Sequence, residues 1–150
     1  MAKLLDAWRK AGWPIFHIRH RSRLKDSPLN PASAGFEIKE IVKPLPGESI
    51  IEKEVNSAFI GTDLEKQLHE RGIGAVVSVG LTTDHCVSTT ARMAGNLGFE
   101  TCVISDATAT FDRTGIDGGH FDAEEVHAVS LASLNGEFAQ ILETADILES

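Results

Sequence analysis

The chain has 150 residues, of which 42% are hydrophobic, 24% charged and 6% aromatic. This is enough apolar material for one folded core, and the balance excludes a disordered or coiled-coil protein. A formal net charge of −8 repels the phosphates of nucleic acids and anionic membranes, so we expect a single domain over residues 1–150 that binds neither.

The start of the chain and its cysteines indicate a cellular compartment. No apolar run approaches the ~20 residues of a membrane-spanning helix, and residues 1–6 lack the apolar segment of a secretory signal. The sequence therefore predicts a cytoplasmic protein. In that compartment its two cysteines, Cys86 and Cys102, are expected to remain thiols.

Helix and strand patterns alternate around a long loop in the first half of the chain. Leu4, Leu5 and Trp8 recur at helical spacing, and Gly12 ends that helix. A segment rich in Pro, Ser and Asn predicts an irregular loop of a length that usually carries function. In chain order we expect a helix over 3–11, a strand over 15–18, a loop over 27–47, a strand over 49–53 and a helix that begins after Thr62 or Asp63.

The second half continues the alternation. Residues 75–80 form a mostly apolar run, typical of a strand buried on both faces of a parallel sheet. The elements expected here are a strand over 75–80, a helix over 84–96, a strand over 101–104, a loop over 105–119, a helix over 123–134, a strand over 138–141 and a helical turn over 145–148. The pattern predicts an α/β fold, a Rossmann-like three-layer αβα sandwich with a mostly parallel sheet.

Three polar segments follow strands, and the carboxyl ends of parallel strands meet at one edge of a sheet. They are residues 82–86, residues 105–108, and Lys53 with Asn56 and Ser57. Cys86 falls in the first turn of a helix, where unpaired amides and the helix dipole favour a thiolate. Lys53 is the lysine placed to add a nearby positive charge. The commoner roles are a small buried hydrophobe for a cysteine and a solvated surface charge for a lysine.

Residues 53–59 (KEVNSAF) and 80–92 (GLTTDHCVSTTAR) resemble the lysine and nucleophile segments of the isochorismatase-like cysteine hydrolases. Residues 105–110 and the late helix with His127 also fit. The resemblance implies that Cys86 is the nucleophile and that Lys53 assists its thiolate. It also implies an oxyanion hole made by the backbone of Thr82 and Cys86, and a non-proline cis peptide between Leu81 and Thr82.

The resemblance further implies the type of reaction. We expect a Cys thiolate to hydrolyse a C–N bond of a small amide, ureido or carbamoyl compound through an acyl-enzyme, without a cofactor. Asn56, Phe59 and Thr108 are expected to bind the substrate, and His120 to touch the substrate or a neighbouring subunit. Homo-oligomers are expected because they are common in this family.

A metal site is not expected in this chain. His17 and His20 are three residues apart on a predicted strand, so their side chains point to opposite faces and do not form a chelating pair.

The sequence departs from the family at its start. Family members open with a hydrophobic strand that ends in an Asp, the general base of a Cys-Lys-Asp triad, whereas this chain opens with the helix that contains Asp6. The chain is therefore expected to be N-terminally truncated relative to the family. Either the true start lies upstream, or a partner donates the strand, or the strands over 15–18 and 75–80 close against each other.

The missing carboxylate leaves alternatives open. Asp84 and Asp106 are the nearest acids that could replace it, but each also has a quieter role, as a helix cap or a loop anchor. The alternative function is a catalytically inactive homologue that acts as a metabolite-binding or oligomeric scaffold. A thiol redox protein is the weakest alternative, because Cys102 lies within a strand and not at C-x-x-C spacing.

Overall fold

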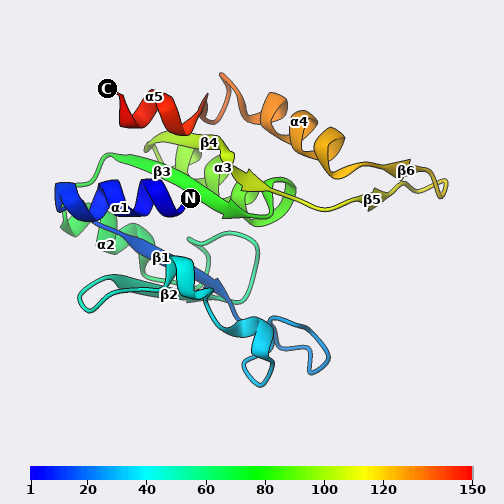
Figure 1. Cartoon of the computed structure of the whole chain (residues 1–150), viewed down its shortest axis with the longest axis horizontal. Helices are drawn as coiled ribbons and strands as arrows, with labels where there is room; N and C mark the ends of the chain where they lie inside the picture. The colour runs from blue at the N-terminus through cyan, green and yellow to red at the C-terminus, as the bar shows by residue number, and fades with distance from the viewer. Residues whose placement is uncertain (150) are drawn as a thin grey trace.

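The computed structural model describes residues 1–149 and confirms the α/β class (Figure 1). The elements in the first half are α1 (Ala2–Ala11), β1 (Phe16–His20), η1 (Ala34–Phe36), η2 (Glu40–Val42), β2 (Ser49–Lys53), α2 (Leu64–Glu70) and β3 (Ala75–Leu81). Those in the second half are η3 (Thr83–Val87), α3 (Ser88–Asn96), β4 (Glu100–Ala109), β5 (Arg113–Thr114), β6 (His120–Phe121), α4 (Ala123–Leu134), β7 (Gln140–Leu142) and α5 (Thr144–Leu148).

The strands form two parallel sheets and one antiparallel hairpin. β1 pairs with β2 in a register that runs from Phe16 opposite Ser49 to His20 opposite Lys53. The second sheet has the order β3-β4-β7, and β5 pairs with β6. Within residues 1–149 no hydrogen-bonded pairing joins β1 to β3. The expectation that these two strands might close against each other is therefore not met.

β3 is less buried than its apolar sequence indicates. Val77, in the middle of the strand, is 37% exposed, although Val76 and Val79 pack against clusters on opposite faces of the strand, as the apolar run predicts. Within residues 1–149, β3 is an edge strand that pairs with β4 on one side only.

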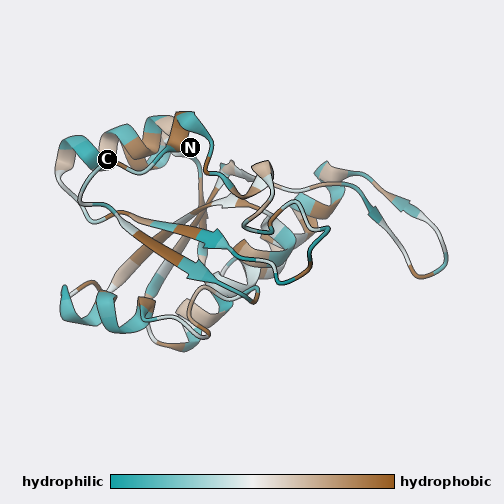
Figure 2. Ribbon diagram, turned by 90° about the horizontal axis from the view of Figure 1, so that it is seen from below, coloured by the Kyte–Doolittle hydropathy of each residue, from teal (hydrophilic) through white to brown (hydrophobic). Residues whose placement is uncertain are grey.

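Helices lie on both sides of the strands and give the three layers of an αβα sandwich (Figure 2). On one side α1 and α5 pack against β4, and Leu4 and Ile104 lie in the centre of that contact. On the other side Leu68 of α2 belongs to a cluster with Phe59 and with Ala94 of α3. Leu134 of α4 belongs to a second cluster with Ala91 of α3. These clusters hold the carboxyl ends of the strands in place.

Glu48 fastens α1 to the first sheet. Its carboxylate accepts hydrogen bonds from Arg9 Nε at 2.6 Å and from the backbone amide of Leu45 at 2.8 Å, and lies 2.7 Å from His17 Nε2. The hydrogen bond from Arg9 is the main reason that the pKa of Glu48 falls to about 2. The carboxylate is therefore charged at neutral pH and in mild acid.

β4 is longer than expected and includes residues 105–108, which were predicted to lie in a loop. After an irregularity between Ser78 and Gly80, the ladder with β3 resumes where Gly80 pairs with Thr108. The Ser-, Asp- and Thr-rich composition indicates a turn, but Ala107 packs in the core beside Ile104 and extends the strand.

The hairpin of β5 and β6 projects from the body of the molecule (Figure 1). Ile116 near its tip is fully exposed. None of the helices within residues 1–149 has the length and apolar character needed to cross a membrane.

Candidate active site

Lys53 and Cys86 meet at the carboxyl ends of the strands. Lys53 is the last residue of β2, and Cys86 lies in η3 directly after β3. The distance from Lys53 Nζ to Cys86 Sγ is 3.2 Å. Lys53 is 3% exposed, so it is not the solvated surface charge that is the commoner role of a lone lysine.

The burial of the Lys53 ammonium is compensated by hydrogen bonds. An ammonium has three N–H donors and no acceptor, and here three acceptors surround it. They are Cys86 Sγ at 3.2 Å, the carbonyl oxygen of Val55 at 2.9 Å and His20 Nδ1 at 3.1 Å. Because a buried charge is costly unless it is hydrogen-bonded, this arrangement fixes the direction of the side chain.

Cys86 sits in a π-helical turn rather than in the first turn of a regular α-helix. The helix predicted over 84–96 divides into the π-helix η3 and the α-helix α3. The peptide bond between Leu81 and Thr82 is cis, as the family resemblance implies. The amides of His85 and Val87 both donate to the carbonyl oxygen of Thr82, at 3.2 and 3.1 Å. Such π-turns are frequent at functional sites.

Two side chains of η3 tie the turn to the rest of the fold. Thr83 is fully buried, and its Oγ1 lies 2.8 Å from His127 Nδ1 in α4. Asp84 accepts hydrogen bonds from Arg113 Nε at 2.7 Å, from Arg113 Nη2 at 3.1 Å and from Thr110 Oγ1 at 2.5 Å. Sequence reasoning missed Arg113 and Thr110, because nothing in the local pattern links them to Asp84.

Neither replacement acid is directed at the cysteine. Burial raises the pKa of Asp84, but hydrogen bonds from Arg113 and Thr110 outweigh it and hold the pKa well below its usual range. Asp106 accepts hydrogen bonds from the amide and the hydroxyl of Thr144, both at 2.8 Å. In the part of the chain that the structure describes, the hydrogen-bond partners of Lys53 and Cys86 include no carboxylate.

The predicted substrate residues are not all brought together. Asn56 Oδ1 lies 3.9 Å from Cys86 Sγ. Phe59 is buried and stacks on Phe99 in the core, and the Thr108 hydroxyl donates to the carbonyl of Ile104 at 3.2 Å. The contact of Phe59 and Thr108 with a substrate stays a prediction.

His120 lies in β6 of the projecting hairpin (Figure 1). Its Nε2 is 3.0 Å from Asp122 Oδ1 and 3.6 Å from Asp112 Oδ2. Among residues 1–149, these three form the one group of His, Cys, Asp and Glu side chains spaced to hold a metal ion, and all three are exposed. The hydrogen bonds and ion pairs of His120 within the described residues do not include Cys86. His17 and His20 bind different partners, Glu48 and Lys53.

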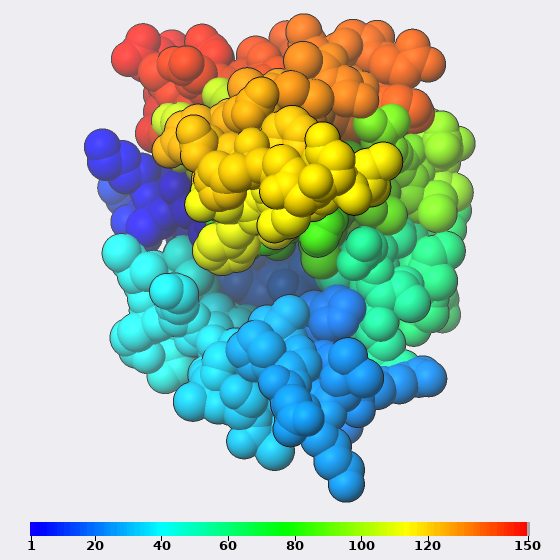
Figure 3. Space-filling view, turned by 90° about the vertical axis from the view of Figure 1, so that its right-hand side faces the viewer, coloured from blue at the N-terminus to red at the C-terminus, as the bar shows by residue number. Residues whose placement is uncertain are grey.

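The space around the strand ends is open to solvent. Figure 3 shows a hollow between the projecting hairpin, in yellow, and the loop segments in light blue and cyan, with the darker blue of the N-terminal segment at its floor. Cys86 and His20 are both partly exposed, while Lys53 beneath them is buried. The cysteine is therefore accessible to a small molecule, while the lysine beside it is shielded from solvent.

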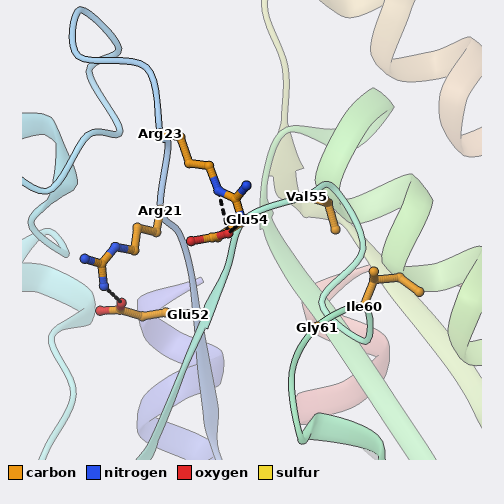
Figure 4. A pocket seen from close by; sticks show the side chains of 7 residues that line it. All are labelled: Arg21, Arg23, Glu52, Glu54, Val55, Ile60 and Gly61. Carbon is orange, nitrogen blue, oxygen red and sulfur yellow. Dashed lines mark hydrogen bonds and ion pairs between the residues drawn. The ribbon is translucent and has the colours of Figure 1, made fainter.

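A second cavity lies beside the basic segment after β1 and has a volume of about 580 Å³ (Figure 4). In it Arg21 pairs with Glu52 at 3.3 Å, and Arg23 pairs with Glu54. Glu52 precedes Lys53 in β2, so its side chain points to the opposite face of the sheet. Neither Lys53 nor Cys86 lines this cavity, and its arginines are exposed and ion-paired.

Comparison with known proteins agrees with this geometry. The isochorismatase domain family matches residues 1–146. YrdC of Bacillus subtilis, an uncharacterized isochorismatase family protein, is 51% identical over 148 residues, which cover 99% of this chain and 79% of that protein. Nicotinamidase 3 of Arabidopsis thaliana is 30% identical over 155 residues, which cover 93% of this chain and 71% of that protein.

Solved structures give the same result. An isochorismatase-family protein from Chromobacterium violaceum superposes with a TM-score of 0.95 at 47% identity, over 99% of this chain and 77% of that one. A cysteine hydrolase from Pseudomonas syringae pv. phaseolicola superposes with a TM-score of 0.90 at 26% identity, over 98% of this chain and 76% of that one. With the sequence match and the fold in agreement, the chain belongs to the isochorismatase family of hydrolases.

Proposed function

We propose that the chain is a cysteine hydrolase that cleaves a C–N bond of a small amide, ureido or carbamoyl compound. The observation that carries the proposal is the 3.2 Å contact between the buried Lys53 ammonium and the Cys86 sulfur. Charge attraction at this distance favours the thiolate, which is the nucleophilic form of cysteine. The name of one more distant relative, a nicotinamidase, agrees with this class of bond, and that of another, a cysteine hydrolase, agrees with a cysteine nucleophile.

In the proposed reaction the Cys86 thiolate attacks the substrate carbonyl carbon. The amides of Thr82 and Cys86 stabilise the oxyanion. The C–N bond then breaks, the Lys53 ammonium gives a proton to the leaving nitrogen, and a thioester to Cys86 remains. Water attacks this acyl-enzyme and gives a proton to the Lys53 amine, so that the carboxylic acid leaves and the thiolate and ammonium are regenerated.

A catalytically inactive scaffold is the second candidate. It is favoured by the hydrogen bonds of the site, since the partners of Lys53 and Cys86 within residues 1–149 include no carboxylate. Asp84 and Asp106 are held by other groups. On this alternative, the protein binds a metabolite at the strand ends without converting it.

A substrate panel separates the two candidates. Release of ammonia or amine is measured with nicotinamide, ureidoacrylate and N-carbamoyl amino acids, for the wild type, Cys86→Ala and the matched control Cys102→Ala. The hydrolase proposal expects turnover of at least one compound by the wild type and by Cys102→Ala, and none by Cys86→Ala. Thermal stabilisation by a panel compound without turnover of any compound supports the scaffold.

The cytoplasmic location, homo-oligomeric association and independence from cofactors stay predictions.

A further inference from the structure

His20 lies beside the proposed catalytic pair, although the reaction above does not use it. It is the last residue of β1, and the parallel register places it directly opposite Lys53, the last residue of β2. Its Nδ1 is 3.1 Å from Lys53 Nζ. No hydrogen bond is found between His20 and Cys86 within residues 1–149, so any influence on the sulfur passes through the lysine.

The chemistry of the contact fixes the state of the imidazole. An ammonium can only donate, so His20 Nδ1 is the acceptor and its proton resides on Nε2. The imidazole is neutral in this arrangement. The other two ammonium donors are occupied by Val55 and Cys86, so His20 takes the remaining N–H and completes the set.

The groups around His20 favour the neutral form. Burial lowers the pKa of His20 below its ordinary value of 6.5, and the charge of Lys53 lowers it further. The charge of Glu54 and a hydrogen bond with the Val55 backbone oppose this shift only in part. On its own strand the neighbouring Arg19 is paired with Glu52.

We propose that neutral His20 is a positioning residue, whose Nδ1 lone pair holds the Lys53 ammonium against the Cys86 sulfur. This inference rests on the proposed function of the Cys86 and Lys53 pair. Protonation of His20 removes the acceptor and places a second cation 3.1 Å from Lys53. Both effects turn the ammonium away from the sulfur, so the site loses its reactivity in mild acid.

The test is the rate at which iodoacetamide alkylates Cys86, followed by peptide mass spectrometry between pH 5 and 8, with Cys102 as internal reference. Three variants are compared with the wild type. His20→Asn keeps an acceptor oxygen near the position of Nδ1 but cannot be protonated. His20→Leu removes the acceptor. His17→Leu, on the same strand but bound to Glu48, is the matched control. Circular dichroism verifies that each variant folds.

We expect His20→Leu to slow alkylation of Cys86 about tenfold at pH 7, because one of three hydrogen bonds to the ammonium is lost. His20→Asn is expected to restore most of the alkylation rate. In this variant the rate should not show the decline in mild acid that we expect for the wild type. The control and Cys102 should be unchanged. A wild-type rate and pH profile in folded His20→Leu would overturn the inference.

This assay needs no substrate, so it separates the inference from the proposed function. If no panel compound is hydrolysed but alkylation of Cys86 depends on residue 20, the positioning role stands and the proposed turnover fails. If a compound is hydrolysed, and His20→Leu leaves both its kcat/KM and the alkylation rate unchanged, the positioning role fails and the hydrolase proposal stands.

Discussion

The replacement Asp84→Asn tests how the nucleophile turn is held. Asp84 is 12% exposed and accepts two hydrogen bonds from Arg113 and one from Thr110. Hydrogen bonds to charged groups contribute about 1.5–3 kcal/mol each and are not additive. The Asn side chain retains one oxygen acceptor, so we expect the free energy of unfolding to fall by about 2–3 kcal/mol. With a urea m-value of about 2 kcal/mol/M, the unfolding midpoint falls by roughly 1 M.

The assay is urea unfolding followed by circular dichroism. A double-mutant cycle of Asp84→Asn with Arg113→Met isolates the pair, and we expect a coupling energy of about 1–2 kcal/mol. Asp26→Asn, in an exposed part of the long loop, is the control and should change the midpoint little. A loss below ~0.5 kcal/mol for Asp84→Asn, or no coupling with Arg113, would refute the reasoning.

The pH dependence of this effect has a defined sign. The pKa of Asp84 is lower in the folded state than its usual value, so the carboxylate stabilises the fold at pH values above the usual range of an Asp, near 3.9. That contribution is lost as the pH falls below this range. The difference between Asp84→Asn and the wild type should therefore be largest near neutral pH and should shrink in acid.

Unfolding experiments check three further expectations. Glu48→Gln should lower the free energy of unfolding by about 1–2 kcal/mol at pH 7. This difference from the wild type should vanish as the pH falls from about 4.5 to about 2. A difference that does not depend on pH would contradict the role of the Glu48 charge. Gly95→Ala should destabilise by ~1–3 kcal/mol, because a Cβ there would lie 2.8 Å from the carbonyl oxygen of Phe138; increased stability would show that this contact relaxes. Leu134 is 0% exposed, so Leu134→Ala should lower the free energy of unfolding by about 2–5 kcal/mol. A loss below ~1 kcal/mol would indicate that the core collapses around the cavity.

Much of the candidate site could be predicted because its residues lie in short segments directly after strands. The spacing of Lys53 and of Cys86 relative to β2 and β3, together with the family resemblance, predicted that the two meet, and the structure places them 3.2 Å apart. From the sequence alone, His20 is recognised only as a residue that does not form a chelating pair with His17. Its role depends on the register between β1 and β2, which aligns it with Lys53 and which no single segment reveals.

Other features follow from tertiary contacts that the sequence pattern does not contain. Arg113 reaches Asp84 across 29 positions of the chain, and an Asp at a helix start indicates a cap rather than a distant ion pair. The exposure of Val77 has a similar origin. Its apolar neighbours predict a buried strand, whereas the strand order within residues 1–149 places β3 at an edge.

The ionisation state of Cys86 is the quantity on which the enzymatic account depends. It can be measured as the ultraviolet absorbance of the thiolate at pH 7 in Cys102→Ser protein, with and without the additional change Lys53→Met. The account predicts that the protein with Lys53 contains more Cys86 thiolate than the Lys53→Met protein, because the ammonium lies 3.2 Å from the sulfur. A thiolate content near that of the unfolded protein, or one that Lys53→Met leaves unchanged, would contradict the account.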